Sequence, residues 1–441
     1  MSALAEPITE LPSQSVDNRI VPPVPESIAD TGIAGSLIDH LILKYLYFRG
    51  ELVGRDIANL LGFQFSLIDE ALETMKRQHF VGVKKSLGMG NSSGVFVLTE
   101  SGRNLARECL ENNQYAGPAP VPLYQYTEVV RRQKLKSNWL NPVSLQRAFK
   151  HLVVEPDIMS QIGPAVNASK SFLIYGQPGN GKTALAEALF RVETEPIYMP
   201  YAVECQGNII QIYDPIYHQK IEDEETVMSA LSTDLPHDSR WFKCRRPFII
   251  TGGELTLDML DLSFNKHSKV YDAPFQLKAN NGIYLIDDFG RQKASPAEIL
   301  NRWIVPMEER LDHFSIGGGA YFSVPFDVVL VFSTNLNAES LVDDALRRRL
   351  GYKIPFGPIS PDLYRQIWQR NCAALQLPFQ SELVDFAIEE LHRQRGVELL
   401  PVHPRDLLNM IVDRLRYEEH DAVVDREMLM WAWDNNFFQS R

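Results

Sequence analysis

Two groups of residues in this 441-residue chain could do chemistry together. The first is GQPGNGKT, residues 176–183, which matches the phosphate-binding pattern GxxxxGK[ST] between a strand-like run and a helix-like run. Its glycines let backbone amides point at phosphate oxygens, and the next helix adds its N-terminal dipole. Lys182 is expected to reach the β- and γ-phosphates, and Thr183 to place its hydroxyl on Mg²⁺. The predicted nucleotide contacts are Gly176, Gln177, Pro178, Gly179, Asn180, Gly181, Lys182, Thr183 and Ala184.

The second group is a pair of adjacent carboxylates, Asp287 and Asp288, at the end of the apolar run GIYLI. Burying carboxylates is costly unless a cation or hydrogen-bond donors compensate. A Mg²⁺ beside the phosphate loop would be such a cation, so Asp287 is predicted to hold the metal through its water shell. Asp288 is then placed to polarise an attacking water. The alternative is a pair of aspartates that only cap a helix or a turn.

Further polar residues follow in an order that fits the same site. Asn335 ends the apolar run VVLVFST and could orient a water or touch the γ-phosphate. Arg348 and Arg349 come soon after, either as a solvated helix end or as groups that reach the γ-phosphate of a neighbouring subunit. Arg405 opens a later helix and could close over the same nucleotide.

The elements that must position these residues form two predicted domains. Four almost wholly apolar runs, SFLIYG, PFIITG, GIYLIDD and DVVLVFST, are typical of parallel strands covered on both faces. Helical stretches separate them, which indicates a doubly wound α/β architecture over residues 140–359. Helical segments follow from Ser360 onward and predict an all-helical lid over residues 360–441.

The N-terminal part is predicted as a disordered tail, a small domain and a linker. Residues 1–33 are proline-containing and lack apolar periodicity, residues 34–114 resemble a winged-helix domain, and residues 115–139 read as a proline-rich, semi-rigid linker. Between Ala34 and Asn112 there are nine Lys plus Arg and nine Asp plus Glu. A DNA-reading helix usually presents positive charge to phosphates, so the balance favours docking to a protein, with DNA binding as the alternative.

The order of these features resembles that of the AAA+ ATPase superfamily, from about Leu140 to the C-terminus. The resemblance implies ATP hydrolysis with Mg²⁺ at the subunit interfaces of a homo-oligomeric ring, often a hexamer. It matches Lys182 and Thr183 to Walker A, Asp287 and Asp288 to Walker B, Asn335 to sensor 1, Arg348 and Arg349 to the arginine-finger region, and Arg405 to sensor 2. The stretches LKANNGIYLIDDFG and HFSIGGGAYFSVP resemble MoxR-type ATPases and bacterial enhancer-binding proteins, in which a β-hairpin precedes the sensor 1 strand. Many members of the superfamily have glutamate where this chain has Asp288, so turnover could be slow.

Composition limits the remaining possibilities. A formal net charge of -12 argues against non-specific coating of nucleic acid. Apolar runs are far shorter than the roughly 20 residues that span a bilayer, and the N-terminus lacks a signal-peptide pattern, so no membrane insertion and a cytoplasmic location are expected. The basic cluster RWFKCRRPF, residues 240–248, is read as surface charge that balances an acidic loop, although contact with a neighbouring subunit, a nucleic acid or a nucleotide is an alternative.

These observations leave three functional hypotheses. The first is an ATPase whose ring remodels a protein partner recruited by the winged-helix-like domain. The second is a DNA-directed ATPase in transposition, replication or transcription, with the winged helix as the reader. The third is a nucleotide-gated scaffold that binds ATP without hydrolysing it.

Overall fold

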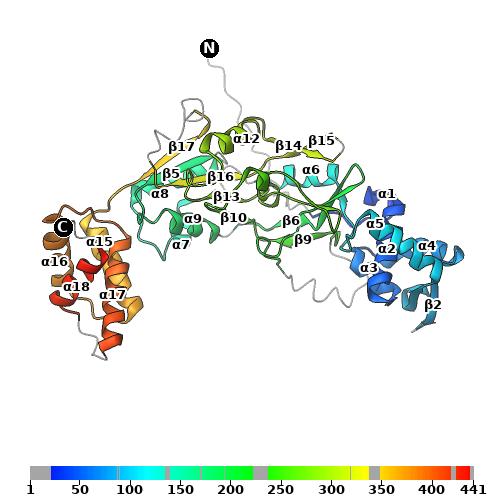
Figure 1. The fold of residues 1–441 in the computed structure, drawn as a ribbon, viewed down its shortest axis with the longest axis horizontal. Helices are drawn as coiled ribbons and strands as arrows, with labels where there is room; N and C mark the ends of the chain where they lie inside the picture. Colours follow the sequence, from blue (N-terminus) through cyan, green and yellow to red (C-terminus); the bar gives the residue numbers. More distant parts are fainter. Residues whose placement is uncertain are drawn as a thin grey trace, which may run out of the picture.

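The computed structural model describes residues 21–86, 88, 90–134, 140–168, 171–192, 194–221, 237–317, 319–336, 348–418 and 424–437. Figure 1 shows a central α/β region between a group of N-terminal helices, in blue, and a group of C-terminal helices, in orange and red. Within the described part of the chain, no helix is both long enough and apolar enough to cross a membrane.

A five-stranded sheet forms the centre of the α/β region, and its neighbouring strands are all parallel. In order across the sheet, the strands are β10 (Phe248–Thr251), β13 (Ile283–Ile286), β16 (Val329–Thr334), β5 (Phe172–Gly176) and β17 (Tyr352–Phe356). Every residue of β13 and β16 is buried. Strands buried on both faces have no polar side to show, which explains their continuous apolar sequences. The predicted α/β fold with a parallel sheet is confirmed.

Helices cover both faces of this sheet. Alternate strand residues point to opposite sides, so both faces carry apolar side chains that need to be covered. Leu285 and Val331 pack into one apolar cluster with residues of α7, α8 and α9. Their sequence neighbours Ile286 and Phe332 pack on the other face around Trp303 of α12. The covering helices are α7 (Pro142–Ala148), α8 (Pro156–Asn167), α9 (Lys182–Phe190) and α12 (Pro296–Glu309). The sheet is therefore the middle layer of three.

A second five-stranded sheet is built from segments that lie far apart in the sequence. In order, its strands are β11 (Ser263–Asn265), β12 (Val270–Asp272), β8 (Asn208–Gln211), β7 (Ala202–Cys205) and β4 (Val121–Pro122). The β7–β8 pair is an antiparallel hairpin that turns at Gln206 and Gly207, both with positive φ. Four of the five strands come from the long stretch between Lys182 and Asp287, so this stretch supplies most of an additional sheet.

An antiparallel hairpin precedes β16 and packs against the second sheet. Its strands are β14 (Leu311–Ile316) and β15 (Ala320–Pro325), as the HFSIGGGAYFSVP segment predicts. Phe314 and Phe322 belong to the same apolar cluster as Val203 and Tyr271 of the second sheet. At the tip, the Gly317 amide donates to Tyr271 Oη at 2.8 Å. The remaining elements of the α/β region are β6 (Ile197–Pro200), β9 (Trp241–Cys244), η2 (Leu257–Leu260) and α11 (Phe275–Lys278).

The N-terminal region contains helices and a three-stranded antiparallel sheet with the order β1-β3-β2. Its elements are α1 (Ile28–Thr31), α2 (Gly35–Arg49), β1 (Glu51–Val53), α3 (Gly54–Leu61), α4 (Phe65–Arg77), β2 (Val81–Ser86), η1 (Asn91–Ser93), β3 (Gly94–Leu98) and α5 (Glu100–Asn112). Three helices followed by a β2–β3 hairpin are the elements that the sequence predicts here. The winged-helix assignment itself stays a prediction.

Two N-terminal segments are more ordered than the sequence predicts. Residues 21–33 of the predicted tail are packed: α1 begins with a capping box at Ser27, and Thr31 is fully buried. Residues 1–20 lie outside the described residues. The predicted linker forms β4 and α6 (Leu123–Arg132), and its residues Ala119 and Val121 are fully buried. Strand β4 pairs with β7 at the edge of the second sheet, so part of the predicted linker belongs to that sheet.

The C-terminal helices form their own apolar core. They are α15 (Pro361–Leu375), α16 (Ser381–Phe386), the π-helix η3 (Ala387–Arg393), α17 (Val402–Glu418) and α18 (Arg426–Asn436). The core contains Trp368, Leu407 and Trp433, and among the described residues it shares none with the clusters around the parallel sheet. A separate core agrees with a separate folding unit. The boundaries of all the predicted domains remain predictions.

Candidate functional site

The GQPGNGKT segment forms a loop between β5 and α9, at the end of a central strand of the parallel sheet. Gly176, Gly179 and Gly181 all have positive φ, at 149°, 86° and 80°. Only glycine adopts such angles readily, so the loop can curl over the first turn of α9. The buried side chain of Asn180 donates through Nδ2 to the Phe356 carbonyl of β17 at 2.8 Å, which ties the loop to the sheet.

Lys182 and Thr183 begin α9 and point back toward the loop and the neighbouring strand. Lys182 is buried, and its Nζ donates to the carbonyls of Gly176 and Gln177 at 2.8 Å each. Burial lowers the pKa of Lys182, while the charges of Asp287 and Asp288 oppose that shift. Thr183 Oγ1 donates to Asp287 Oδ2 at 2.6 Å. The loop and the acidic end of β13 are thus in direct contact.

Asp288 and Asn335 meet across neighbouring strands. Asp287 and Asp288 follow β13, and Asn335 follows β16, its parallel neighbour, so all three lie at the same edge of the sheet. Asn335 Nδ2 donates to Asp288 Oδ1 at 2.6 Å. The other aspartate, Asp287, accepts from the Asp288 amide through Oδ1 at 2.9 Å. The two carboxylates therefore have different neighbours: Asp287 faces Thr183, and Asp288 faces Asn335.

Two of the predicted arginines, Arg349 and Arg405, form salt bridges outside this cluster. Arg349 pairs with Glu308 of α12 at 2.6 Å, and Arg348 beside it is exposed. Arg405, in the first turn of α17, pairs with its neighbour Asp406 at 3.2 Å. These two salt bridges do not include Lys182 or the paired aspartates. The roles predicted for the arginines stay predictions.

The sequence analysis missed two contacts around the site. Gln292, four residues after Asp288, donates through Nε2 to the carbonyls of Asp287 and Asp288 at 3.0 and 3.2 Å. The loop residue Gln177 donates to Glu398 of the C-terminal region at 3.0 Å. A single glutamine after a turn, such as Gln292, matches no sequence motif. Only its position in the IDDFGRQ segment could have indicated a role.

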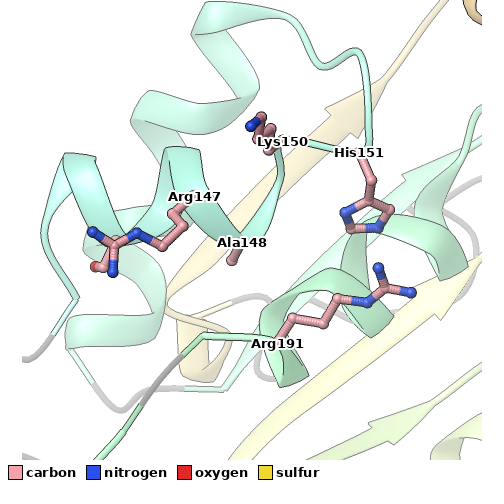
Figure 2. Close-up of a pocket in the computed structure, with 6 residues that line it drawn as sticks. Arg147, Ala148, Lys150, His151 and Arg191 are labelled. Carbon is pink, nitrogen blue, oxygen red and sulfur yellow. The ribbon is translucent and has the colours of Figure 1, made fainter.

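A basic pocket of about 490 Å³ lies at the other end of α9 from the loop. It is lined by Ser144, Arg147, Ala148, Lys150, His151 and Arg191. In Figure 2, the side chains of His151 and Arg191 point toward each other, whereas Arg147 points away from them. Nine helical residues span about 13 Å, so the pocket is distinct from the phosphate loop. Arg147 and Arg191 lie at helix C-termini, where positive charge complements the helix dipole.

The basic cluster of residues 240–248 is not the wholly exposed surface that the sequence predicts. Arg240 is only 1% exposed and forms a salt bridge with Asp238 at 2.8 Å. Arg246 is held by the carbonyls of Gln133 and Asn281, at 2.8 and 2.7 Å. Burial lowers the pKa of Arg246 to about 10. These two side chains bind partners inside the protein, because a charge removed from water needs a compensating partner.

Comparisons with known proteins give distant likenesses. Residues 360–435 match a domain of unknown function, DUF8689. No curated protein matches the chain. Among solved structures, NtrX from Brucella abortus is 15% identical, with a TM-score of 0.40; the match covers 68% of this chain and 59% of NtrX. The RuvB Holliday junction branch migration motor of Thermotoga maritima is also 15% identical, with a TM-score of 0.36 and coverage of 66% and 73%.

Proposed function

We propose that this chain is an AAA+ ATPase that binds and hydrolyses ATP with Mg²⁺ at the loop between β5 and α9. One observation carries the proposal: Thr183 of the loop and Asp287 after β13 are joined at 2.6 Å, with Asp288 and Asn335 joined beside them at 2.6 Å. Hydroxyl and carboxylate oxygens are the ligands that Mg²⁺ prefers, so the residues present fit the metal. When bound, Mg²⁺ would neutralise charge on the phosphates.

The side chains of the site suit phosphoryl transfer to water. Glycine amides of the loop and Lys182 would bind the phosphate oxygens, and Thr183 with Asp287 would hold the metal. Asp288 would accept a hydrogen bond from the attacking water, and Asn335 would hold that carboxylate in place at Oδ1. Electrostatic stabilisation and positioning, rather than covalent chemistry, would supply the rate enhancement.

Arginines outside the cluster support a ring as the working form. Arg348 is exposed at the start of the segment before β17, where it is available to a second subunit. We infer a homo-oligomeric ring, with a hexamer as the expected form, in which Arg348 or Arg349 of one subunit reaches the next site. Arg405 would approach the nucleotide of its own subunit from the C-terminal helices, which act as the lid.

The N-terminal region is proposed to recruit a protein partner that the ring remodels. Its helix α4 carries Asp69 and Glu73, which both accept from Asn91 Nδ2, at 2.8 and 2.7 Å. The hairpin residue Lys84 pairs with Glu51 at 2.6 Å. A helix with this acidic surface is unsuited to face DNA phosphates, which favours a protein partner. DNA-stimulated ATPase activity that is lost in a Lys84→Ala, Lys85→Ala variant would reverse this ranking.

ATP turnover by the purified protein tests the proposal. Lys182→Ala should reduce turnover to the background of the assay, because the phosphates lose their main cation. Asp288→Asn should still bind ATP but fail to complete turnover, while Lys150→Ala, in the separate basic pocket, should leave turnover unchanged. Undiminished turnover in Lys182→Ala would rule out this site. ATP binding without turnover in the unaltered protein would instead support a nucleotide-gated scaffold.

A further inference from the structure

The backbone at Asp288 is held in an unfavourable conformation. Its φ is 48°, in the left-handed region that residues with a Cβ adopt less readily than glycine. The turn therefore needs contacts that keep it in place. Main-chain bonds supply two of them: the Phe289 amide donates to Ser333 at 2.7 Å, and the Arg291 amide donates to Asp288 at 3.0 Å. The first bond ties the residue after Asp288 to β16, and the second closes the turn on the carbonyl of Asp288 itself.

The side chain of Gln292 contacts main-chain groups on both sides of the same turn. Its Nε2 donates to the carbonyls of Asp287 at 3.0 Å and Asp288 at 3.2 Å, and lies 3.4 Å from the carbonyl of Gly252, just after β10. Its Oε1 accepts from the Gly290 amide at 2.7 Å. One half-buried amide group thus contacts both aspartate carbonyls, the nearby glycine amide and the neighbouring strand end.

We propose that Gln292 is a positioning residue that sets the direction of the Asp288 carboxylate for the attacking water. This inference rests on the proposed ATP hydrolysis. Gln292 holds the backbone on both sides of Asp288, while Asn335 holds the carboxylate itself. A misplacement of about 1 Å in a catalytic group can reduce the rate about 100-fold. The Asp side chain is short, so a shift of its backbone passes almost directly to its oxygens.

The chemistry of the contacts explains why the residue is a glutamine. The turn presents carbonyl oxygens that need a donor and an amide, at Gly290, that needs an acceptor. A glutamine amide has both. A glutamate at this position would lose the donors and add a negative charge near two aspartates, whereas a methionine would keep the length and lose all the polar contacts. The substitution Gln292→Glu therefore removes the donated bonds only, and Gln292→Met removes the bond from the Gly290 amide as well.

Steady-state kinetics test the positioning role. We expect both variants to lower kcat for ATP about 10- to 100-fold and to change KM less than about threefold, because the nucleotide contacts at Lys182 and Thr183 are untouched. The matched control is Lys293→Ala, the exposed neighbour, which should keep both values. A lower kcat together with a changed KM, both following a lowered melting temperature, would point to a structural role only. That result would overturn the inference.

Hydrogen exchange gives a second readout that needs no turnover. Without nucleotide, amides of residues 288–290 should exchange at least about tenfold faster in Gln292→Met than in Lys293→Ala, because the turn loses its clamp. Unchanged exchange would overturn the inference whatever the kinetics. If the unaltered protein turns over ATP no faster than Lys182→Ala, the proposed function fails; if it turns over ATP and Gln292→Met keeps kcat, the inference alone fails.

Discussion

The N-terminal region and the C-terminal helices meet the α/β region through contacts of different kinds. At the N-terminal junction, one apolar cluster runs from Leu61 and Phe63 to Ala202, Ile209 and Val270 of the second sheet. At the C-terminal junction, the helices keep a core of their own, and the hydrogen bond from Gln177 of the phosphate loop to Glu398 is exposed to solvent. The N-terminal region thus shares a continuous core with the second sheet, whereas the C-terminal helices have a separate core and lie beside the phosphate loop.

A buried arginine completes the N-terminal junction. Arg240 forms a salt bridge with Asp238, and both side chains are almost fully buried. Its Nη1 also donates to the Thr31 carbonyl at 2.8 Å, and its guanidinium lies 5.5 Å from the centre of the Phe63 ring. The Asp238 amide donates to Pro22 at 3.0 Å. These contacts bind the N-terminal region firmly to the stretch that forms the second sheet.

The C-terminal junction includes hydrogen bonds that are more exposed to solvent. Arg370 donates to the carbonyls of Lys150 and Leu152 at 3.2 and 2.8 Å, and Gln177 donates to Glu398 at 3.0 Å. All three bonds are exposed to solvent, where such interactions contribute little. The difference indicates that the C-terminal helices can shift against the loop at low cost. The N-terminal region can shift only together with the second sheet and the hairpin that rests on it.

Removing the buried arginine should have the largest effect. Arg240→Ala should destabilise the protein by about 3–5 kcal/mol, because it leaves the Asp238 carboxylate buried without its partner. Urea unfolding measures the loss in the free energy of unfolding. Hydrogen exchange of the amides in α2 and β8 then shows whether stability is lost on both sides of the junction. The control is Arg245→Ala, an exposed residue of the same cluster, which should change stability by less than about 0.5 kcal/mol. A loss confined to α2 would contradict a shared core.

The parallel sheet and its site could be predicted because each depends on local patterns. Apolar runs identify strands buried on both faces, and the loop between β5 and α9 has a fixed spacing. Carboxyl ends of parallel strands meet at one edge, so Asp287, Asp288 and Asn335 could be expected together.

The second sheet and the N-terminal junction could not be predicted, because they depend on long-range contacts. Strand β4 has two residues in a proline-rich stretch, and α1 has four, so neither shows a period. Arg240 belongs to a run of charges, which usually lies on the surface. Gln292 contacts carbonyls rather than side chains, and its role depends on the φ of Asp288, which no sequence pattern records.

Acid should loosen the C-terminal helices. His392 and His403 stack 5.1 Å apart in their core, and His392 also lies 3.0 Å from Tyr364 Oη. Burial lowers the pKa of His392 to about 4, with a further contribution from His403, and burial lowers the pKa of His403 to about 4. The unfolded chain therefore takes up protons first as the pH falls. The stability that the two neutral histidines contribute is fully present above about pH 6.5 and is lost progressively as the pH falls to about 4.

The expected loss between pH 7 and pH 5 is about 2–4 kcal/mol for the two histidines together. Protection factors of α17 amides at the two pH values measure it. The variant His392→Phe, His403→Leu lacks both titrating groups, so its α17 protection should vary less with pH. Equal α17 protection at pH 7 and pH 5 in the unaltered protein would contradict the prediction.

A methyl group on the phosphate loop should separate the loop from the C-terminal helices. Gly179 has φ of 86°, and a Cβ there would lie 2.6 Å from Val402 Cγ1 at the start of α17. Gly179→Ala should cost about 1–2 kcal/mol from backbone strain, plus the cost of moving Val402. Gly207→Ala is the control, since Gly207 has φ of 80° but no neighbour within 4 Å of an added Cβ, so the change measures the strain alone. Equal losses in the two variants would show that α17 moves away freely.

The smallest effect is expected at the surface contact between Gln177 and Glu398. Glu398→Ala should reduce stability by less than about 1 kcal/mol, since the hydrogen bond is exposed and competes with water. A double-mutant cycle with Gln177→Ala isolates the pair, and Glu390→Ala, also exposed on the C-terminal helices, is the control. A coupling of about 2 kcal/mol or more would mean that this junction is as firm as the one at Arg240. Weak coupling would leave the C-terminal helices free to move when the loop binds a ligand, while the N-terminal region stays fixed to the second sheet.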